Sequence, residues 1–438
     1  MFFFEKIVDQ KIFLIFLFTI ILVCNCSAKT GKQYLLLFET PDSLTQLASK
    51  YYGEGNYRET LALLSAADTS IFSPKFLFYI GMSYAALYDF QSAQKYFKKT
   101  ILGDSTNVNY HFQFGRLLLQ SGFTNDAVDE FKLCFVLDST YLPATFQLGL
   151  LYNAQKKYPE KEVEIFSFLI RQNPNDFFSC YYLGDALKRL KMADSGMVFI
   201  KKSIELNPHY YPSLLALAYY KYAGHEFKSA LEYFQKADSI RPHDKDIVYQ
   251  IGECLRNLSA YDEALARFRE VISIDSSIAL YHAQTGYTYF LMKQYDFAIL
   301  AYKKAVSIDT ANVQYYINLA LVYEQIDSVE GVIESYQQAA QAYHPELISF
   351  VYNDLAGYCF KNNLWVEAAK AYKRVVELNP ENLMALNWLG YSYERIPDKK
   401  SAISTYENYL EKTKKNNPKP GLRIHLEELL KTLKEKKN

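Results

Sequence analysis

The sequence lacks an excess of charge of either sign. Its 438 residues include 48 Lys and Arg and 48 Asp and Glu, spread along the whole chain. Proteins that bind nucleic acid or anionic lipid usually have a positively charged surface. We therefore expect neither partner here. The exception is residues 412–437, which contain eight lysines. We interpret this cluster as a solvated tail, with a binding patch as the alternative.

Motifs of catalysis and cofactor binding are also missing. The sequence contains no HExxH or CxxC pair of the kind that binds a metal, and no GxxxxGK[ST], GxGxxG or GxSxG loop. Carboxylate pairs such as Glu427 with Glu428 and Asp244 with Asp246 are interpreted as surface or turn residues. We therefore expect no metal, no cofactor and no enzymatic activity. The seven histidines stand apart from one another, at His111, His209, His225, His243, His282, His344 and His425.

Cysteine is scarce, and the chain contains only six. Four lie beyond residue 28. They stand singly and no common spacing relates them, which argues against a disulfide framework or a metal site. We expect them to be buried thiols in helices. They are Cys134, Cys180, Cys254 and Cys359.

The one long apolar run lies near the start of the sequence. Residues 12–23 are apolar, follow Lys6 and Lys11, and precede small residues of the kind that signal peptidase reads. The run is shorter than the about 20 residues that span a bilayer. We expect a signal peptide over 1–28, cleaved after Ala28, and export of the rest to the bacterial periplasm or cell envelope. An uncleaved anchor or a lipid on Cys24 or Cys26 is the alternative, and either would supply the only membrane contact.

What the chain does have is a fixed interval between small residues and a high content of aromatic ones. Aromatic residues make up 16% of the sequence, with 39 Tyr and 30 Phe. A period of 33 to 36 residues indicates a tandem array of one supersecondary unit rather than unrelated domains. The small residues that mark it are Ala48, Gly81, Gly115, Gly149, Gly184, Ala218, Gly252, Gly286, Ala320, Ala356 and Gly390.

One unit, residues 279–312 with Gly286 at position 8, shows the pattern. Its apolar residues follow helical spacing in two runs separated by the polar break 292–294, which predicts two helices and a turn. We expect the small residue at position 8 to meet the small one at position 20, here Ala298, where the antiparallel helices touch. A ring at position 24, here Tyr302, is expected to fill the gap to the next unit.

Position 32 ends each unit. Proline there cannot continue a helix, and a hydroxyl there is expected to cap the helix that follows. The prolines are Pro174, Pro208, Pro242 and Pro380, and the hydroxyl residues are Ser105, Ser139, Ser276 and Thr310.

The pattern resembles the tetratricopeptide repeat over about residues 41–418. The resemblance is carried by Leu and Gly at positions 7 and 8, as in Leu148-Gly149, Leu183-Gly184 and Leu389-Gly390. Tyr at position 11, Ala at positions 20 and 27 and a ring at position 24 add to it. It implies an all-α fold, an α-solenoid built as a right-handed superhelix of tandem antiparallel helix pairs. The first helix of each pair would line the concave face, and a last amphipathic helix would cap the stack.

The expected domain organisation follows from this register. Thr60 and Gly196 at position 20, and short insertions in repeats 4 and 9, depart from the pattern. The segments are 1–28 signal peptide, repeats at 41–74, 75–107, 108–141, 142–176, 177–210, 211–244, 245–278, 279–312, 313–348, 349–382 and 383–418, and 419–438 capping helix and basic tail.

The candidate binding site is an aromatic groove along the concave face, built from positions 2, 5, 9, 12 and 13 of the first helices. Rings there could hold a peptide by apolar contact, although the same rings could instead pack against the neighbouring repeat. Position 5 carries Phe78, Phe112, Phe146, Tyr181 and Tyr249; position 9 carries Arg116, Asp185, Tyr219, Glu253 and Tyr287; position 12 carries Lys188, Tyr222, Arg256 and Phe290.

The expected function is a non-enzymatic protein-protein interaction scaffold of the bacterial cell envelope, binding peptides or partner proteins along this groove. One alternative is a structural subunit of an envelope assembly machine that works through its convex face or capping helix. Another is a regulatory partner of a glycan or lipopolysaccharide enzyme. Repeats of this family that clamp acidic chaperone tails carry Lys at position 5 and Asn at position 9, and no repeat here does. We therefore expect no chaperone-tail binding.

Overall fold

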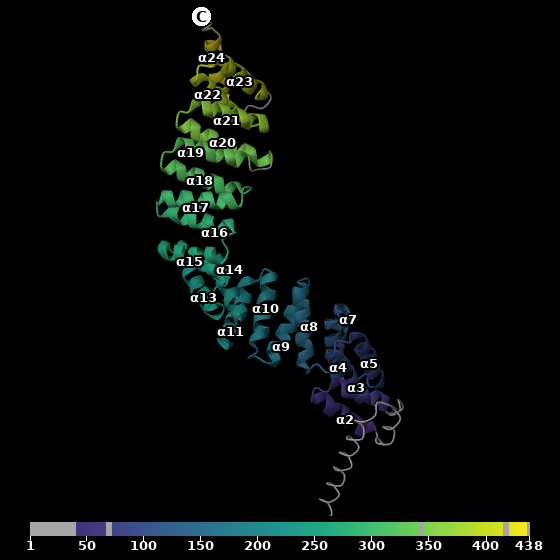
Figure 1. The fold of residues 1–438 in the computed structure, drawn as a ribbon. Coiled ribbons are helices and arrows are strands. Elements are labelled where there is room, and N and C mark those ends of the chain that lie inside the picture. Colours follow the sequence, from purple (N-terminus) through teal and green to yellow (C-terminus); the bar gives the residue numbers. More distant parts are fainter. Residues whose placement is uncertain (1–40, 67–71, 342–344, 415–419, 436–438) are drawn as a thin grey trace, which may run out of the picture. The chain divides into compact units, whose positions relative to one another are not determined.

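The computed structural model describes residues 41–66, 72–341, 345–414 and 420–435, and Figure 1 shows its ribbon. The expected signal peptide at 1–28 lies outside the described residues. Within them every regular element is a helix, which confirms the predicted all-α class. No helix in this part of the chain is long and apolar enough to cross a membrane.

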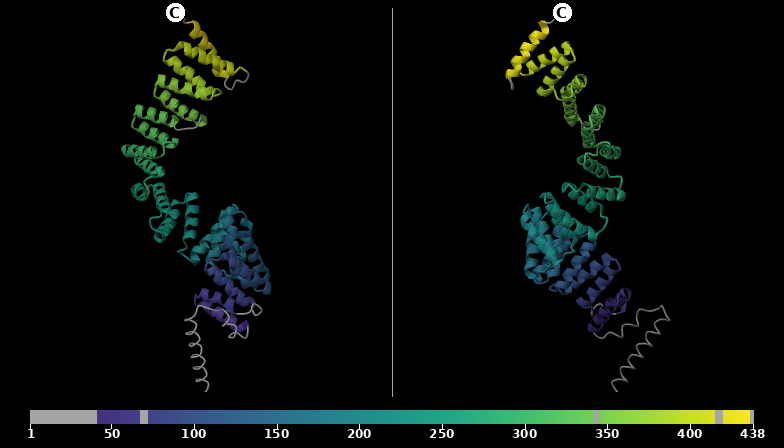
Figure 2. Two further views of the ribbon diagram at one scale, coloured as in Figure 1. Left: turned by 45° about the vertical axis from the view of Figure 1, so that its right-hand side comes forward. Right: turned by 90° about the vertical axis from the view of Figure 1, so that its left-hand side faces the viewer.

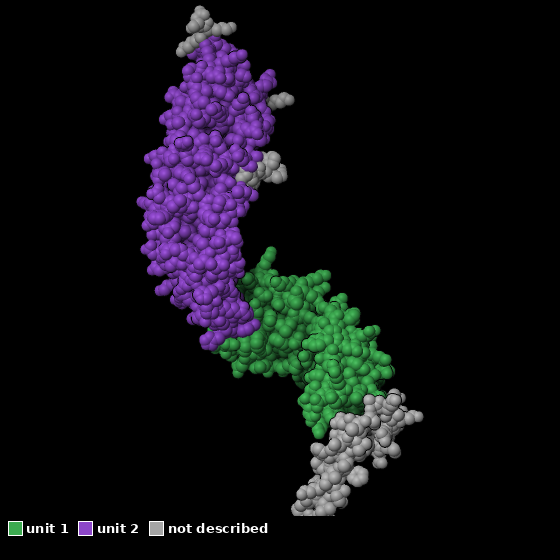
Figure 3. Space-filling view, in the orientation of Figure 1, with its two compact units in different colours: residues 1–208 green, residues 209–438 purple. Residues whose placement is uncertain are grey.

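The chain divides into two compact units, residues 1–208 and 209–438 (Figure 3). Unit 1 contains α2 (Pro41–Gly53), α3 (Tyr57–Ala66), α4 (Pro74–Ala86), α5 (Phe90–Gly103), α6 (Val108–Gln120), α7 (Thr124–Leu137), α8 (Leu142–Gln155), α9 (Pro159–Gln172), α10 (Phe177–Arg189) and α11 (Ala193–Leu206). Unit 2 contains α12 (Tyr211–Ala223), α13 (Phe227–Ile240), α14 (Lys245–Asn257), α15 (Tyr261–Ile274), α16 (Ala279–Leu291), α17 (Tyr295–Ile308), α18 (Val313–Gln325), α19 (Val329–Gln341), α20 (Pro345–Lys361), α21 (Trp365–Leu378), α22 (Leu383–Arg395), α23 (Lys399–Lys412) and α24 (Pro420–Glu435).

Consecutive helices pack in tandem pairs, and within each unit every pair packs on the next one (Figure 2). Even-numbered helices from α4 to α22 are the first members of their pairs, and odd-numbered ones are the second. The last helix, α24, packs on α23, where Leu426 and Leu430 are buried beside Tyr406 and Tyr409. This arrangement confirms the predicted tandem helix pairs and the capping helix.

Each pair is closed by a turn with one residue in the left-handed region. In the turn after α16, Lys293 has φ 58° and the Gln294 N–H donates to the Tyr289 carbonyl, 2.9 Å away. This 6→1 bond is the Schellman arrangement that often ends helices. Glycine usually takes the left-handed position, and only two of these turns use it. The residues are Gly55, Tyr88, Gly122, Lys156, Lys191, His225, Ser259, Lys293, Asp327, Asn363 and Pro397.

The turns between pairs are ordered by carboxylates and amides rather than by the expected hydroxyls. Asp104, Asp138, Asp275 and Asp309 each accept a hydrogen bond from the backbone N–H two residues on, at 2.8–3.2 Å. The expectation that Ser105, Ser139, Ser276 and Thr310 cap the following helices is wrong. Those helices begin two residues later, after Asn107, Tyr141, Ile278 and Asn312.

In most repeats with a glycine at position 8, the side chain nearest to it is the ring at position 24. A Cβ atom added to Gly252 would lie 2.7 Å from the ring of Phe268, and one added to Gly286 would lie 3.0 Å from the ring of Tyr302. The small residue at position 8 therefore makes room for the position-24 ring of its own pair. Repeat 5 alone shows two glycines in direct contact, Gly184 and Gly196.

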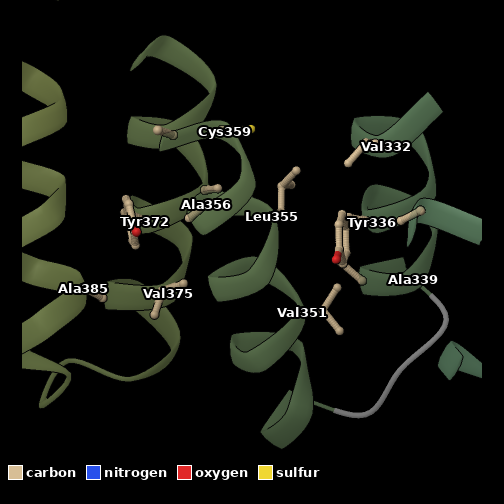
Figure 4. Packing of buried hydrophobic residues seen from close by; sticks show 14 of the residues in the cluster. Val332, Tyr336, Ala339, Val351, Leu355, Ala356, Cys359, Tyr372, Val375 and Ala385 are labelled. Carbon is tan, nitrogen blue, oxygen red and sulfur yellow. The ribbon is translucent and has the colours of Figure 1, made fainter. Parts of the chain in front are cut away.

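The core continues through each unit as side chains shared by neighbouring pairs. In Figure 4, Tyr336 of α19 points toward Val351 and Leu355 of α20, and Ala356 on the same helix lies beside Tyr372 of α21. Because each helix supplies side chains to both of its neighbours, packing fixes the register of every first helix. The first helices are thus a rigid base for surface residues.

Candidate functional site

Two of the predicted groove rings lie in the core of unit 1. Phe78 and Phe112 are only 8% and 9% exposed. The ring of Phe78 lies 5.0 Å from that of Tyr110, and the ring of Phe112 lies 5.3 Å from that of Tyr141. Tyr110 belongs to the following repeat, and Tyr141 directly precedes α8 of the following repeat, so these rings join consecutive repeats.

The other predicted residues of repeats 4 and 5 form a second group. Phe146 is half-buried, 6.3 Å from the ring of Tyr182. Tyr181 is half-buried, and burial raises its pKa to about 12. Asp185 pairs with the guanidinium of Arg189, and Lys188 is exposed. The charges at positions 9 and 12 therefore reach the surface, whereas the rings do so only in part.

Arg116 borders a small hollow on the first helices of repeats 1 to 3. The hollow, about 230 Å³, is lined among others by Tyr52 of α2, Met82 of α4 and Gln113 of α6. Arg116 is exposed, and its Nη1 donates to Oε1 of Gln113 at 3.1 Å. Its guanidinium lies 6.0 Å from the ring of Phe112. Of the predicted residues of unit 1, Arg116 is the one that lines this hollow.

In unit 2, four predicted residues form a network around a buried carboxylate. Glu253 is 6% exposed, and its Oε2 accepts hydrogen bonds from Arg256 at 2.7 Å and from the Tyr222 hydroxyl at 3.3 Å. Its Oε1 is buried without a partner among the described residues. Burial raises the pKa of Glu253, and burial raises the pKa of Tyr222 to about 12. Tyr249 lies nearby, and burial raises its pKa as well.

The remaining rings of unit 2 differ in exposure. Tyr249 is half-buried, 5.6 Å from the ring of Tyr281 in the next repeat. Tyr219 is 38% exposed and packs edge-on against Phe234. Phe290 is half-buried and stacks 6.5 Å from the ring of Tyr287. Tyr287, at 41% exposed, is the most open of the predicted rings.

Arg256 connects the buried network to a hollow on the surface. Its guanidinium lies 4.9 Å from the centre of the Tyr287 ring, and its Nη1 donates to Oε1 of Gln284 at 2.6 Å. The hollow beside it has a volume of about 520 Å³, and Gln314 and Asn318 of α18 line its other side. The side chains of Arg256, Gln284 and Tyr287 therefore form one wall of an open polar hollow.

A second hollow continues the first along α18. It has a volume of about 490 Å³ and shares Asn312 and Gln314 with its neighbour. Ile317 and Phe350 supply apolar surface, and Phe350 is 60% exposed. We call the surface formed by the two hollows the amide groove. Its principal residues are Arg256, Gln284, Tyr287, Gln314, Ile317, Asn318 and Phe350.

The amide side chains of this groove can form hydrogen bonds with the backbone of a bound peptide. A carboxamide offers both donors and an acceptor, which match the N–H and C=O of an extended chain. Nε2 of Gln314 donates to Oδ1 of Asn318 at 2.9 Å, and Gln284 is held by Arg256, so the amides are pre-positioned. Tyr287 and Phe350 supply exposed rings at which apolar side chains can bind.

Sequence reasoning included Arg256 and Tyr287 but missed the amides and Phe350. Leu280, Gln284 and Tyr287 stand at positions 2, 6 and 9 of their repeat, which is the i, i+4, i+7 spacing of one helix face. A search for that stripe would have found Gln314 and Asn318 in the next repeat. Position 5 is off this stripe, which is why its rings turn toward the neighbouring repeat.

In the part of the chain that the structure describes, the side chains that could bind a metal lie apart from one another. No group of three or more His, Cys, Asp or Glu side chains lies close enough there to hold a metal ion. The four cysteines beyond residue 28 are all buried and free. Burial raises the pKa of Cys134, Cys254 and Cys359 to about 12 each.

Known structures with helix pairs of this kind match the chain at low similarity. A tetratricopeptide repeat protein from Parabacteroides merdae is 16% identical over 57% of this chain and 98% of its own, with a TM-score of 0.40. The C-terminal part of a repeat protein from Cytophaga hutchinsonii is 16% identical over 64% and 99%, with a TM-score of 0.41. Yeast Tom70 is 13% identical over 90% and 96%, with a TM-score of 0.36.

Two family models match the sequence itself. One, described as TPR repeat, matches residues 286–327, and the other, described as tetratricopeptide repeat, matches residues 360–418. Both stretches fall on helix pairs of unit 2, and the same pairing of helices recurs through the described part of the chain. Neither model describes an enzyme family. These two stretches are tetratricopeptide repeats, the described helix pairs fit a tandem array of them, and the repeat supports a role as a protein-protein interaction scaffold.

Proposed function

We propose that this scaffold binds an extended segment of a partner protein along the amide groove of unit 2. The observation that carries the proposal is the row of Gln284, Gln314 and Asn318 on adjacent first helices, at the rim of two connected hollows. Backbone pairing with such amides would give affinity, and Tyr287 and Phe350 would select apolar side chains.

The groove is nearly balanced in charge. Arg256 is already paired with Glu253 at 2.7 Å, and Asp309 lines the second hollow. A bound peptide therefore gains little from long-range charge attraction, and its affinity should change little between 50 and 300 mM salt. Peptides with apolar residues spaced along an extended chain should bind better than highly charged ones.

An array of extended peptides, probed first with the wild-type protein and then with groove variants, tests the proposal. Tyr287→Ala combined with Gln314→Ala should weaken the selected peptides by about tenfold, since about 1.4 kcal/mol is lost. Phe297→Ala with Gln338→Ala removes an exposed ring and an exposed amide from second helices and is the matched control. Equal binding by both double variants would reject the amide groove as the site.

We further propose that the scaffold acts in the bacterial cell envelope, after export directed by residues 1–28. The support is the apolar run at 12–23 and the small residues that end at Ala28. The mass of the mature N-terminus tests this directly. A first residue at position 29 agrees with the proposal, whereas an intact N-terminus in a cytoplasmic fraction contradicts it.

A further inference from the structure

Another hollow of unit 1, different in character, lies between the second helices α7 and α9, with the first helix α8 between them. It is bounded by α7, α8 and α9, which Figure 1 labels, and its volume is about 460 Å³. This falls within the range of about 300–1,000 Å³ that is usual for ligand pockets. Its lining is Lys132, Phe135, Val136, Thr145, Leu148, Tyr152, Lys161, Glu164, Ile165, Phe168 and Arg171.

The walls of this hollow are apolar and partly open to solvent. Phe135 is 40% exposed and Val136 is 78% exposed, whereas Leu148 and Tyr152 form a buried floor. The rings of Phe135 and Phe168 meet edge-on with centroids 5.5 Å apart, which ties α7 to α9 across the hollow. We call this surface the α7–α9 pocket.

Val136 departs from the pattern of the second helices of unit 2. It stands five residues after the position-24 ring, Phe131. At the same distance from their own rings, most repeats of unit 2 carry a polar residue, as expected on an exposed helix face. These residues are Ser239, Ser273, Ser307, Gln341, Glu377 and Glu411. Repeat 2 also carries an apolar residue at this distance from its ring, Leu102, which is 88% exposed. Val136 lies beside the apolar hollow and forms part of its lining.

The rim of the α7–α9 pocket carries an excess of positive charge. Lys132, Lys161 and Arg171 line it, with Glu164 as the single carboxylate. Arg171 is exposed, and Lys161 lies 5.2 Å from the ring of Tyr152. Lys132 pairs with Asp129 only in an exposed contact, which contributes little. The chain as a whole is neutral, so the positive charge of the rim is a local feature of this pocket.

The floor adds one unsatisfied polar group. Thr145 is 4% exposed, and its hydroxyl is buried without a hydrogen-bond partner among the described residues. Buried hydroxyls are normally paired. The pocket thus combines an apolar wall, a cationic rim and a floor hydroxyl that the chain itself leaves unpaired.

We propose that the α7–α9 pocket binds an acidic peptide segment of a partner protein, with a bulky apolar side chain seated between Phe135, Val136 and Phe168. The carboxylates of the segment pair with Arg171, Lys132 and Lys161. A peptide fits better than a buried lipid tail because the apolar surface extends onto the open side chain of Val136, which an occupant must also cover. This site shares no residue with the amide groove, and two of its three helices, α7 and α9, are second members of their pairs.

Fluorescence anisotropy with the full chain and a labelled synthetic peptide tests the proposal. The probe is a short peptide with one phenylalanine and one leucine among glutamates, and its control has lysines in place of the glutamates. The acidic peptide should bind about tenfold tighter than the basic one. Val136→Asp should weaken the acidic peptide by about tenfold or more, because it places a like charge at the mouth of the pocket.

Matched variants keep the test specific. Val198→Asp changes a valine that is 63% exposed on α11, another second helix of unit 1, and should leave the affinity unchanged. Arg171→Gln with Lys132→Gln should weaken binding by about threefold, whereas Lys95→Gln with Lys98→Gln on α5 should not. Tyr287→Ala with Gln314→Ala should leave it intact, which separates this site from the amide groove.

Three results would overturn the proposal. The first is equal affinity of Val136→Asp and wild-type protein for the acidic peptide, and the second is equal or better binding of the basic peptide. The third is saturable binding of dodecanoate at this pocket with no binding of the acidic peptide, which would assign the pocket to a lipid carboxylate instead.

Discussion

Gly184 of α10 and Gly196 of α11 approach each other so closely that a Cβ atom on Gly184 would lie 2.7 Å from the carbonyl oxygen of Gly196. A Cβ on Gly196 would lie 2.5 Å from the carbonyl oxygen of Gly184. The obstacle is backbone on both sides, which cannot rotate away as a side chain can. This pair of helices therefore depends on two glycines facing one another.

Gly196→Ala should destabilise unit 1 by about 1–3 kcal/mol, because the new methyl group forces the two helices apart. This cost outweighs the helix propensity that alanine gains. Gly357→Ala is the control, since a Cβ there meets nothing within 4 Å, and it should stabilise by about 0.5–1 kcal/mol. Urea denaturation followed by circular dichroism measures both, and a stabilised Gly196→Ala would contradict the close approach.

The buried ion pair of Glu162 and Arg189 joins repeats 4 and 5. Glu162 is fully buried and accepts two hydrogen bonds from the Arg189 guanidinium, one of them at 2.7 Å, and one from Asn153 at 3.0 Å. Arg189→Ala should cost about 3–5 kcal/mol, because it leaves a buried carboxylate without its cation. Glu162→Leu with Arg189→Met should cost much less. If the double variant is as unstable as the single one, the loss comes from packing and not from the unpaired charge.

His111 should make the stability of unit 1 depend on pH. Its Nδ1 lies 2.7 Å from Glu130 and its Nε2 lies 3.0 Å from the Ser105 carbonyl, so both nitrogens face acceptors. The hydrogen bond to Glu130 raises the pKa of His111. A raised pKa stabilises the folded state fully below the unfolded value of about 6.5, and this contribution is lost as pH rises through the folded value.

Denaturation of the wild-type protein and His111→Gln between pH 5.5 and 9 checks this. The stability advantage of the wild type should be largest at the acidic end and shrink as pH rises. Glu130→Gln should lose the same pH dependence, since the cause is the shared hydrogen bond. An advantage that grows with pH would show that the imidazole is held neutral.

Replacing two of the predicted groove rings by alanine should show, from the loss of stability, which ring is a core residue and which is a surface residue. Phe112→Ala should destabilise by about 3–5 kcal/mol, as expected for a buried ring, because Phe112 packs against Phe131 and Tyr141. Tyr287→Ala should cost about 1 kcal/mol or less, since it loses mainly its contact with Arg256. Thermal melts of the two variants check the contrast. Equal destabilisation would mean that Tyr287 is also a packing residue.

The buried thiols should resist alkylation in the folded protein. Burial raises the pKa of Cys134, Cys254 and Cys359 to about 12 and raises that of Cys180. Because the thiolate is the nucleophile, iodoacetamide at pH 8 should modify these four on the order of 100-fold more slowly than in denaturant. Peptide mapping by mass spectrometry reports each cysteine separately. Rapid labelling of any one of them in native buffer would place it at an opening in the fold.

Much of the fold could be predicted from sequence because the signal repeats. A glycine at position 8 followed by a ring at position 24 is weak evidence when it occurs once. Its recurrence, as Gly252 with Phe268 and again as Gly286 with Tyr302, predicts a helix pair in each repeat. Spacing did not predict that the atoms nearest to these glycines belong to the ring at position 24. Spacing gives the face of a helix, but it does not say which side chain reaches across.

The site was predicted less well for a related reason. The aromatic residues at position 5 were predicted to line the groove. Phe78 and Phe112 instead lie in the interface with the next repeat, because burying a large ring there is favourable. Gln284, Gln314 and Asn318 carry no such signal, because amides are common on any exposed helix. Only the placement of adjacent first helices shows that these three line connected hollows.

The packing of each helix against its neighbours in sequence also affects how the chain folds as it is synthesised. Nearly every contact within a unit joins segments that are synthesised one after another, so the entropy lost in closing each loop is small. A helix pair can be stabilised as soon as the next pair has emerged, without waiting for a distant strand or terminus. Folding of such an array can begin at any repeat and propagate to its neighbours, and a defect in one repeat weakens mainly the adjacent ones.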